Sequence, residues 1–156
     1  MNHGPENNRV ETRDHYAHLT VIDTRWMDND AYGHVNNVVY YSFFDTAVTR
    51  WLIEQGLLDI AGSEAIGLVV ETQCRYASPL TFPDRVTAGI RVVHLGRSSV
   101  RYELALFRNE DVAPAATGHF VHVYVDRASR TSVTIPDAVR AALERLRLPI
   151  APSPTL

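Results

Sequence analysis

One long helical pattern constrains this sequence more than any other feature. Between Asn37 and about Gln55, apolar residues recur every three or four positions, and Gly56 ends the pattern. They fill two adjoining rows of the helix: Val39, Phe43, Ala47 and Trp51, and Tyr40, Phe44, Val48 and Leu52. Because this apolar arc is wide, most of the helix surface must be covered by other parts of the chain. The fold therefore needs a second layer that can enclose a helix about 28 Å long.

The sequence after Gly62 changes to a two-residue period, which predicts strands that could form this layer. Four strands in hairpin-like succession are expected at 66–76, 84–96, 99–109 and 116–126. In the first, one face is expected to carry Ile66, Leu68, Val70, Thr72, Cys74 and Tyr76.

Two shorter elements complete the pattern. The β-branched segment 18–26 predicts a first strand, and 135–147 predicts a last helix with Pro136 in its first turn. A sheet segregated from one long helix indicates the α+β class. We expect a curved antiparallel sheet of about five strands, wrapped around the helix, because this arrangement buries both layers at once.

The composition fits one globular domain. The chain has 156 residues, of which 46% are hydrophobic and 21% charged, which is enough for one core and short for two. We expect a flexible N-terminal segment (1–15), a single domain (16–148) and a flexible C-terminal tail (149–156), because both ends lack apolar periodicity.

Charge and cysteine content weigh against several classes of function. Fifteen Lys and Arg against eighteen Asp and Glu give a net charge of −3, and the basic residues are scattered, so no nucleic-acid partner is expected. The single Cys74 excludes an intrachain disulfide framework and a Cys-based zinc site, and suits a reducing cytosol. The polar N-terminus and the lack of a run of about 18 apolar residues predict a cytoplasmic protein without a membrane partner.

The loop before the long helix is the candidate site. Asp28 and Asp30 precede Gly33, and Asn36 or Asn37 can cap the helix. A helix start offers free N–H donors and a partial positive charge, which stabilise an oxyanion. A carboxylate opposite those donors can activate water or act as a nucleophile, so the loop contains the two parts that acyl transfer requires.

The same residue types also have an ordinary structural explanation. Asp, Asn and Gly before a helix are common turn and capping residues. A histidine such as His34 near a helix start is more often packed or hydrogen-bonded than catalytic. Spacing alone leaves both interpretations open.

The loop carries a family resemblance. The run DNDAYGHVNNVVYY (28–41), the helix after it and the segment RYASPLTFPDRV (75–86) resemble the hotdog-fold thioesterases of the 4-hydroxybenzoyl-CoA thioesterase type. The resemblance covers roughly residues 18–147 and includes the full D-x-D-x-x-G-H-V-N-N pattern. It implies a hotdog fold, hydrolysis of an acyl-CoA thioester without a cofactor, and assembly into dimers or tetramers with acyl-CoA sites at the subunit interface.

The resemblance also assigns roles to residues. It makes Asp30 the catalytic carboxylate, acting as base or nucleophile, and Asn37 the residue whose backbone N–H polarises the thioester carbonyl. His34 becomes an auxiliary and Asp28 an acid that stabilises the loop. Residues expected to bind substrate are Gly33, Val35, Asn36, Tyr40 and, on the CoA phosphates, Arg97, Ser98 and Ser99.

Three alternatives remain at this stage. Hydratases and dehydratases of enoyl or hydroxyacyl thioesters use the same architecture, although their usual loop pattern is not found here. A binding module for acyl thioesters would bind CoA esters and release no thiol. A metal site from His119 and His122 is disfavoured, because their spacing on a strand points them to opposite faces.

Overall fold

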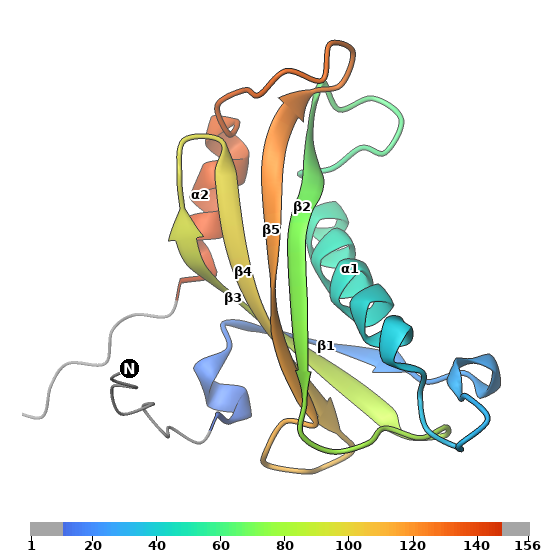
Figure 1. Ribbon diagram of the computed structural model, residues 1–156. Helices are drawn as coiled ribbons and strands as arrows, with labels where there is room; N and C mark the ends of the chain where they lie inside the picture. The colour runs from blue at the N-terminus through green and yellow to red at the C-terminus, as the bar shows by residue number, and fades with distance from the viewer. Residues whose placement is uncertain (1–10, 148–156) are drawn as a thin grey trace, which may run out of the picture.

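The described part of the chain forms one five-stranded antiparallel sheet, one long helix and one short helix (Figure 1). The computed structural model describes residues 11–147. The helices are α1 (Asn37–Glu54) and α2 (Asp137–Arg145), with short 3-10 turns at Arg13–His15 and Trp26–Asp28. The strands are β1 (His18–Asp23), β2 (Ala65–Tyr76), β3 (Arg85–Leu95), β4 (Ser99–Arg108) and β5 (Ala116–Asp126). None of the helices among these residues is long and apolar enough to cross a membrane.

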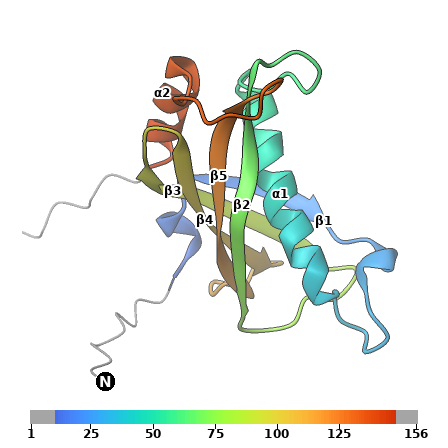
Figure 2. The same ribbon diagram turned by 45° about the horizontal axis from the view of Figure 1, so that its top comes forward.

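The sheet curves around α1, which confirms the expected α+β hotdog architecture. Its strand order is β1-β3-β4-β5-β2, and α1 lies along one face, as two views show (Figures 1 and 2). The buried face of α1 carries Tyr40, Phe43, Phe44, Ala47, Val48, Trp51 and Leu52. Helix α2 adds Val139 and Leu143 to the same core. Burial of these side chains is the main source of stability for the helix.

The helix boundaries follow the sequence closely. The expected helix from Asn37 to about Gln55 is confirmed, with Asn36 as its N-cap. The C-terminal helix is shorter than expected, because Pro136 is its N-cap and the helix ends at Arg145. The first strand is also shorter, since the chain turns into a 3-10 helix at Trp26.

The pairing of β2 differs from the expected hairpin succession. Strands β3, β4 and β5 pair in sequence, whereas β2 pairs with β5 and lies at an edge of the sheet. The free side of β3 is taken by β1. The connection 77–84 therefore crosses from one side of the sheet to the other below the start of α1 (Figure 1).

A β-bulge makes the two faces of β2 differ from those that the sequence predicted. The register against β5 shifts between Val69 and Glu71, so the alternation reverses in the middle of the strand. Before the bulge, Gly67 and Val69 therefore face α1. Beyond the bulge, Cys74 and Tyr76 face the same side. Sequence periodicity could not show this reversal, because a single extra residue leaves the apolar pattern almost unchanged.

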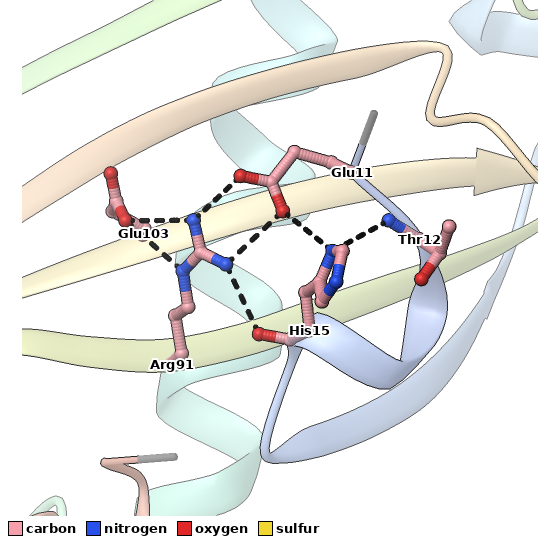
Figure 3. A network of polar contacts seen from close by, with 5 residues as sticks. All are labelled: Glu11, Thr12, His15, Arg91 and Glu103. Carbon is pink, nitrogen blue, oxygen red and sulfur yellow. Dashed lines mark hydrogen bonds and ion pairs between the residues drawn. The ribbon is translucent and has the colours of Figure 1, made fainter. Parts of the chain in front are cut away.

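A charged network holds residues 11–15 against the outer face of the sheet (Figure 3). The Arg91 guanidinium lies 3.0 Å from a Glu11 carboxylate oxygen and 2.9 Å from one of Glu103, and donates to the His15 carbonyl at 3.1 Å. Burial opposes ionisation of Glu11, but the hydrogen bond and charge of Arg91 outweigh it and lower the pKa of that carboxyl. Residues 11–15 of the expected flexible segment are thus packed on the sheet; residues 1–10 and the expected tail 149–156 lie outside the described range.

Candidate active site

Asp28 fastens the loop that joins β1 to α1. Its side chain is 1% exposed. One carboxylate oxygen accepts the backbone N–H of Arg25 at 2.8 Å, and the other accepts the Arg25 guanidinium at 2.8 Å. The Asp28 carbonyl accepts the N–H of Asn36 at 2.8 Å, which ties the loop to the N-cap of α1. These contacts fit the expected role of Asp28 as a loop-stabilising acid.

Asp30 is held differently, because only half of its carboxylate is used by the loop. Its Oδ1 accepts the backbone N–H of Tyr32 at 2.8 Å and, more weakly, that of His34 at 3.5 Å. Oδ2 accepts no hydrogen bond from the described residues. The side chain is half-buried and fixed at one oxygen, and the second oxygen is available to water or substrate.

Gly33 provides the turn that brings the loop back to the helix. Its φ is +80°, a region that residues with a Cβ rarely adopt, and its N–H donates to the Asp30 carbonyl at 3.1 Å. The Asp30 N–H donates to the His34 carbonyl at 2.8 Å, closing the turn from the other side. Gly33 itself does not line the cleft described below, so the structure gives it a backbone role where sequence reasoning expected a binding one.

The start of α1 presents a free backbone donor beside this loop. Asn36 caps the helix, accepting the Val38 N–H at 3.2 Å on its side chain and the Val39 N–H at 2.9 Å on its carbonyl. The N–H of Asn37 has no acceptor among the described residues. Since the N-terminus of an α-helix carries about half a positive charge, this amide is suited to a developing oxyanion.

Asp30 and Asn37 line one open cleft of about 670 Å³. Of the residues that the sequence proposed, the cleft wall contains Asp30, His34, Val35, Asn36, Asn37 and Tyr40. The His34 side chain is exposed and makes no hydrogen bond within the described part of the chain. The structure thus gathers most of the proposed site residues at one place.

Sequence reasoning missed the opposite wall, which consists of Tyr76, Ala77, Ser78 and Pro79. The Tyr76 hydroxyl donates to the Asn37 carbonyl at 3.1 Å, linking β2 to the first turn of α1. The Tyr40 hydroxyl accepts the Leu80 N–H at 3.3 Å, and burial raises the pKa of Tyr40. The segment RYASPL forms part of the family resemblance. It was the sequence feature from which this wall could have been predicted.

Arg97, Ser98 and Ser99 are not part of this cleft. Arg97 and Ser98 lie in the β3–β4 turn and Ser99 is the first residue of β4, at the end of the sheet where α2 packs (Figure 1). The Arg97 guanidinium donates to the Thr134 hydroxyl at 3.2 Å, and its carbonyl accepts the N–H of Ile135. Within one chain, the proposed phosphate anchor is therefore separated from Asp30.

Other polar groups of the described residues lie outside this cleft. A cavity of about 340 Å³ on the outer face is lined by the Arg91 network, whose charges are paired with one another, and also by Arg75 and Arg101. His122 faces the core between α1 and the sheet, whereas His119 lies near Glu71 on the outer face, so the two histidines point apart as expected. Across residues 11–147, no group of three or more possible metal ligands is found.

Comparison with known proteins decides the family. Residues 24–143 match the thioesterase-like superfamily. The chain belongs to this superfamily. Its fold is similar to that of the PA5185 protein of Pseudomonas aeruginosa, with a TM-score of 0.85 and 55% identity, covering 87% of this chain and 95% of that one.

Two further relatives have informative names. A Thermus thermophilus thioesterase, solved in complex with coenzyme A and zinc, is 30% identical with a TM-score of 0.68, covering 85% of this chain and 94% of that one. The L-carnitine dehydrogenase/betainyl-CoA thioesterase of Agrobacterium fabrum is 28% identical over 85% of this chain. The chain spans only 26% of that longer relative. Together with the family match, these relatives identify this superfamily member as a thioester hydrolase.

Proposed function

We propose that the protein hydrolyses acyl-CoA thioesters in the cleft between the acid loop and the start of α1. The observation that supports this most directly is the pairing of a free carboxylate oxygen on Asp30 with a free N–H on Asn37 along one cleft. A thioesterase relative solved with coenzyme A supports CoA as the carrier of the acyl group.

In the proposed reaction, the thioester carbonyl oxygen accepts the Asn37 N–H at the positive end of α1. Asp30 then either removes a proton from an attacking water or attacks the carbonyl carbon to form a mixed anhydride that water cleaves. Both routes break the C–S bond, and the CoA thiolate leaves and takes up a proton. Oxyanion stabilisation of this kind typically contributes about 3 kcal/mol and a general base about 10²- to 10⁴-fold in rate.

His34 and Asn36 have supporting roles in the proposed reaction and are neither its base nor its nucleophile. His34 lies at the cleft wall and can contact the leaving group or its water, while Asn36 keeps α1 capped so that the Asn37 N–H remains free. Val35, 4% exposed, and Tyr40, 3% exposed, form the packed base of the cleft. These two side chains are positioned to exclude water from the thioester.

We further propose that two copies pair through β2. This edge strand is 12 residues long, its outer side has no neighbour in the sheet, and Leu68, Val69 and Val70 are 36%, 47% and 60% exposed. An unpaired apolar edge of this length favours association with another strand. Antiparallel pairing of β2 with its own copy would give a closed two-fold dimer with one continuous sheet, and two dimers could assemble further into a tetramer.

The dimer also gives the β3–β4 turn a role. Two-fold pairing places the end of one sheet that carries this turn beside the cleft end of the other copy. Arg97, with Ser98 and Ser99, could then contact the CoA phosphates across the interface. This is the arrangement that the family resemblance implied.

The function is tested by measuring thiol release from aliphatic and aromatic acyl-CoAs of increasing size. Hydrolysis should yield one thiol per ester cleaved. Crotonyl-CoA, followed by loss of its enoyl absorbance, serves as the control for hydratase activity. Tight binding of acyl-CoAs without thiol release would instead indicate a binding module and overturn the proposal.

A further inference from the structure

The cavity on the outer face of the sheet has the composition of an anion-binding site. Its volume of about 340 Å³ is within the range of small-molecule pockets, and it shares no lining residue with the Asp30 cleft. In the part of the chain that the structure describes, its lining contains three arginines, Arg75, Arg91 and Arg101, and two carboxylates, Glu11 and Glu103. Neither the proposed reaction nor the core uses this group of charges.

Arg91 has a structural role in this cavity, because it fastens residues 11–15 to the sheet as one wall (Figure 3). Every nitrogen of its guanidinium donates a hydrogen bond: Nε to Glu103, one terminal nitrogen to Glu11 and the His15 carbonyl, and the other to Glu11. Both lining carboxylates are thus bound to Arg91. This leaves Arg75 and Arg101 as the cations that a ligand can use.

Arg75 and Arg101 differ from Arg91 in having no partner. Neither guanidinium makes a hydrogen bond or an ion pair with any described residue. The side chain of Arg101 is half-buried on β4, and that of Arg75 is exposed on β2. A guanidinium has five N–H donors and stays charged at all physiological pH values. Partial burial of Arg101 without a counterion is unfavourable, so its place in a cavity wall points to an anion that enters the cavity.

The strand register places these two arginines on either side of one position. Gln73, His119 and Glu103 pair across β2, β5 and β4 and form a row on the outer face. Arg75 follows Gln73 by two residues and Arg101 precedes Glu103 by two, so both point to this same face. The strand spacing and rise put the Cα atoms of the two arginines about 16 Å apart. Two extended arginine side chains can therefore hold opposite ends of one small anion above the row.

The chemistry of the lining favours phosphate groups. A guanidinium binds two phosphate oxygens at once through parallel N–H donors. The Gln73 amide and the Thr117 hydroxyl also line the cavity, and both can donate to phosphate oxygens without adding charge. The Glu71 carboxylate of the same face lies 3.6 Å from His119 Nε2 and is outside the lining. A ligand with two linked phosphates presents one anionic group to each free arginine.

We propose that the outer-face cavity binds a small molecule with two linked phosphate groups, held at one end by Arg75 and at the other by Arg101. The site lies apart from the Asp30 cleft, so it does not depend on the proposed hydrolysis. A free diphosphate and the diphosphate of coenzyme A share this chemistry, and the experiment below separates the two.

Pyrophosphate is the probe, titrated calorimetrically into the full-length protein in a phosphate-free buffer. We expect saturable binding of one pyrophosphate per chain. Arg75→Gln and Arg101→Gln should each weaken binding about tenfold, because each removes charge-assisted hydrogen bonds. Arg101→Lys should keep part of the affinity, since it keeps the charge and loses the paired donors. The matched control is Arg145→Gln, which changes an exposed arginine of α2 outside the cavity and should bind as wild type does.

Thermal melting separates binding from folding. Because neither arginine has a partner among the described residues, Arg75→Gln and Arg101→Gln should melt as wild type does without ligand. Saturating pyrophosphate should raise the melting temperature of wild type and Arg145→Gln, and should raise it less at the same concentration in the two cavity variants.

Competition identifies the source of the diphosphate. Displacement of pyrophosphate by coenzyme A would place the diphosphate of that molecule in the cavity, and retention at saturating coenzyme A would show a separate ligand; both results support the site. Wild type that does not bind pyrophosphate would overturn the proposal. Equal weakening in Arg145→Gln and the cavity variants would also overturn it, by showing only non-specific attraction to positive charge.

Discussion

Asp28 and Asp30 are separated by a single residue, yet the first is bound on both carboxylate oxygens by Arg25 and the second offers a free oxygen to the cleft. The 3-10 turn that ends at Asp28 separates the two environments. Asp28 therefore stabilises the loop, and Asp30 is the acid available for the proposed reaction. This division leads to opposite expectations for their substitution.

Asp30→Asn should reduce kcat/KM for acyl-CoA hydrolysis by about 10²- to 10⁴-fold, because the amide can neither take a proton from water nor act as a nucleophile. The amide oxygen can still accept the Tyr32 N–H, so the melting temperature should stay close to that of wild type. Thiol-release kinetics and thermal melting measure the two effects. Near wild-type turnover in this variant would exclude Asp30 as the catalytic carboxylate.

Asp28→Ala should act mainly on stability. Removing the carboxylate leaves the partly buried Arg25 N–H without its acceptor, a loss of about 1–3 kcal/mol in the free energy of unfolding. Urea unfolding followed by circular dichroism measures this loss. Asp28→Asn is the matched control, since it can still accept the Arg25 N–H and should lose less. Unchanged stability in Asp28→Ala would contradict the fastening role.

Val70→Lys should convert the proposed dimer into a monomer. Val70 is 60% exposed on the edge strand, and a lysine there in each copy would place charge in the proposed seam and disfavour strand pairing. Size-exclusion chromatography with light scattering should show half the wild-type mass, and thiol release should fall with it. The control is Val112→Lys, 68% exposed and away from β2. Wild type that is monomeric at micromolar concentration would refute the dimer.

The stability of the protein should fall steeply in mild acid because of His122. Burial lowers the pKa of this histidine in the folded state to about 4, below the value of about 6.5 in an unfolded chain. As the pH falls, the unfolded state therefore binds the proton before the folded state does. The free energy of unfolding should decrease by roughly 3 kcal/mol between about pH 6.5 and pH 4. Urea unfolding at several pH values measures this slope. His122→Gln should flatten it, and replacement of the exposed His94 by Gln should not.

Local sequence patterns determined much of this structure. The apolar rows predicted α1 from Asn37 to within one residue of its end, and period-two alternation predicted β3, β4 and β5, because these signals need only neighbours along the chain. The run from Asp28 to Asn37 also carried both the proposed carboxylate and the proposed amide donor. These residues are close in sequence, so one loop and one helix start suffice to bring them together.

Only the tertiary structure decided the features that depend on distant contacts. The pairing of β2 with β5, the bulge at Val69 and the wall formed by Tyr76 all arise from hydrogen bonds between segments far apart in sequence. Two strand registers that differ by one residue have almost the same composition, so periodicity cannot choose between them. The family resemblance separated the roles of Asp28 and Asp30, but only the folded loop shows that Arg25 binds the first acid and that the open cleft lies beside the second.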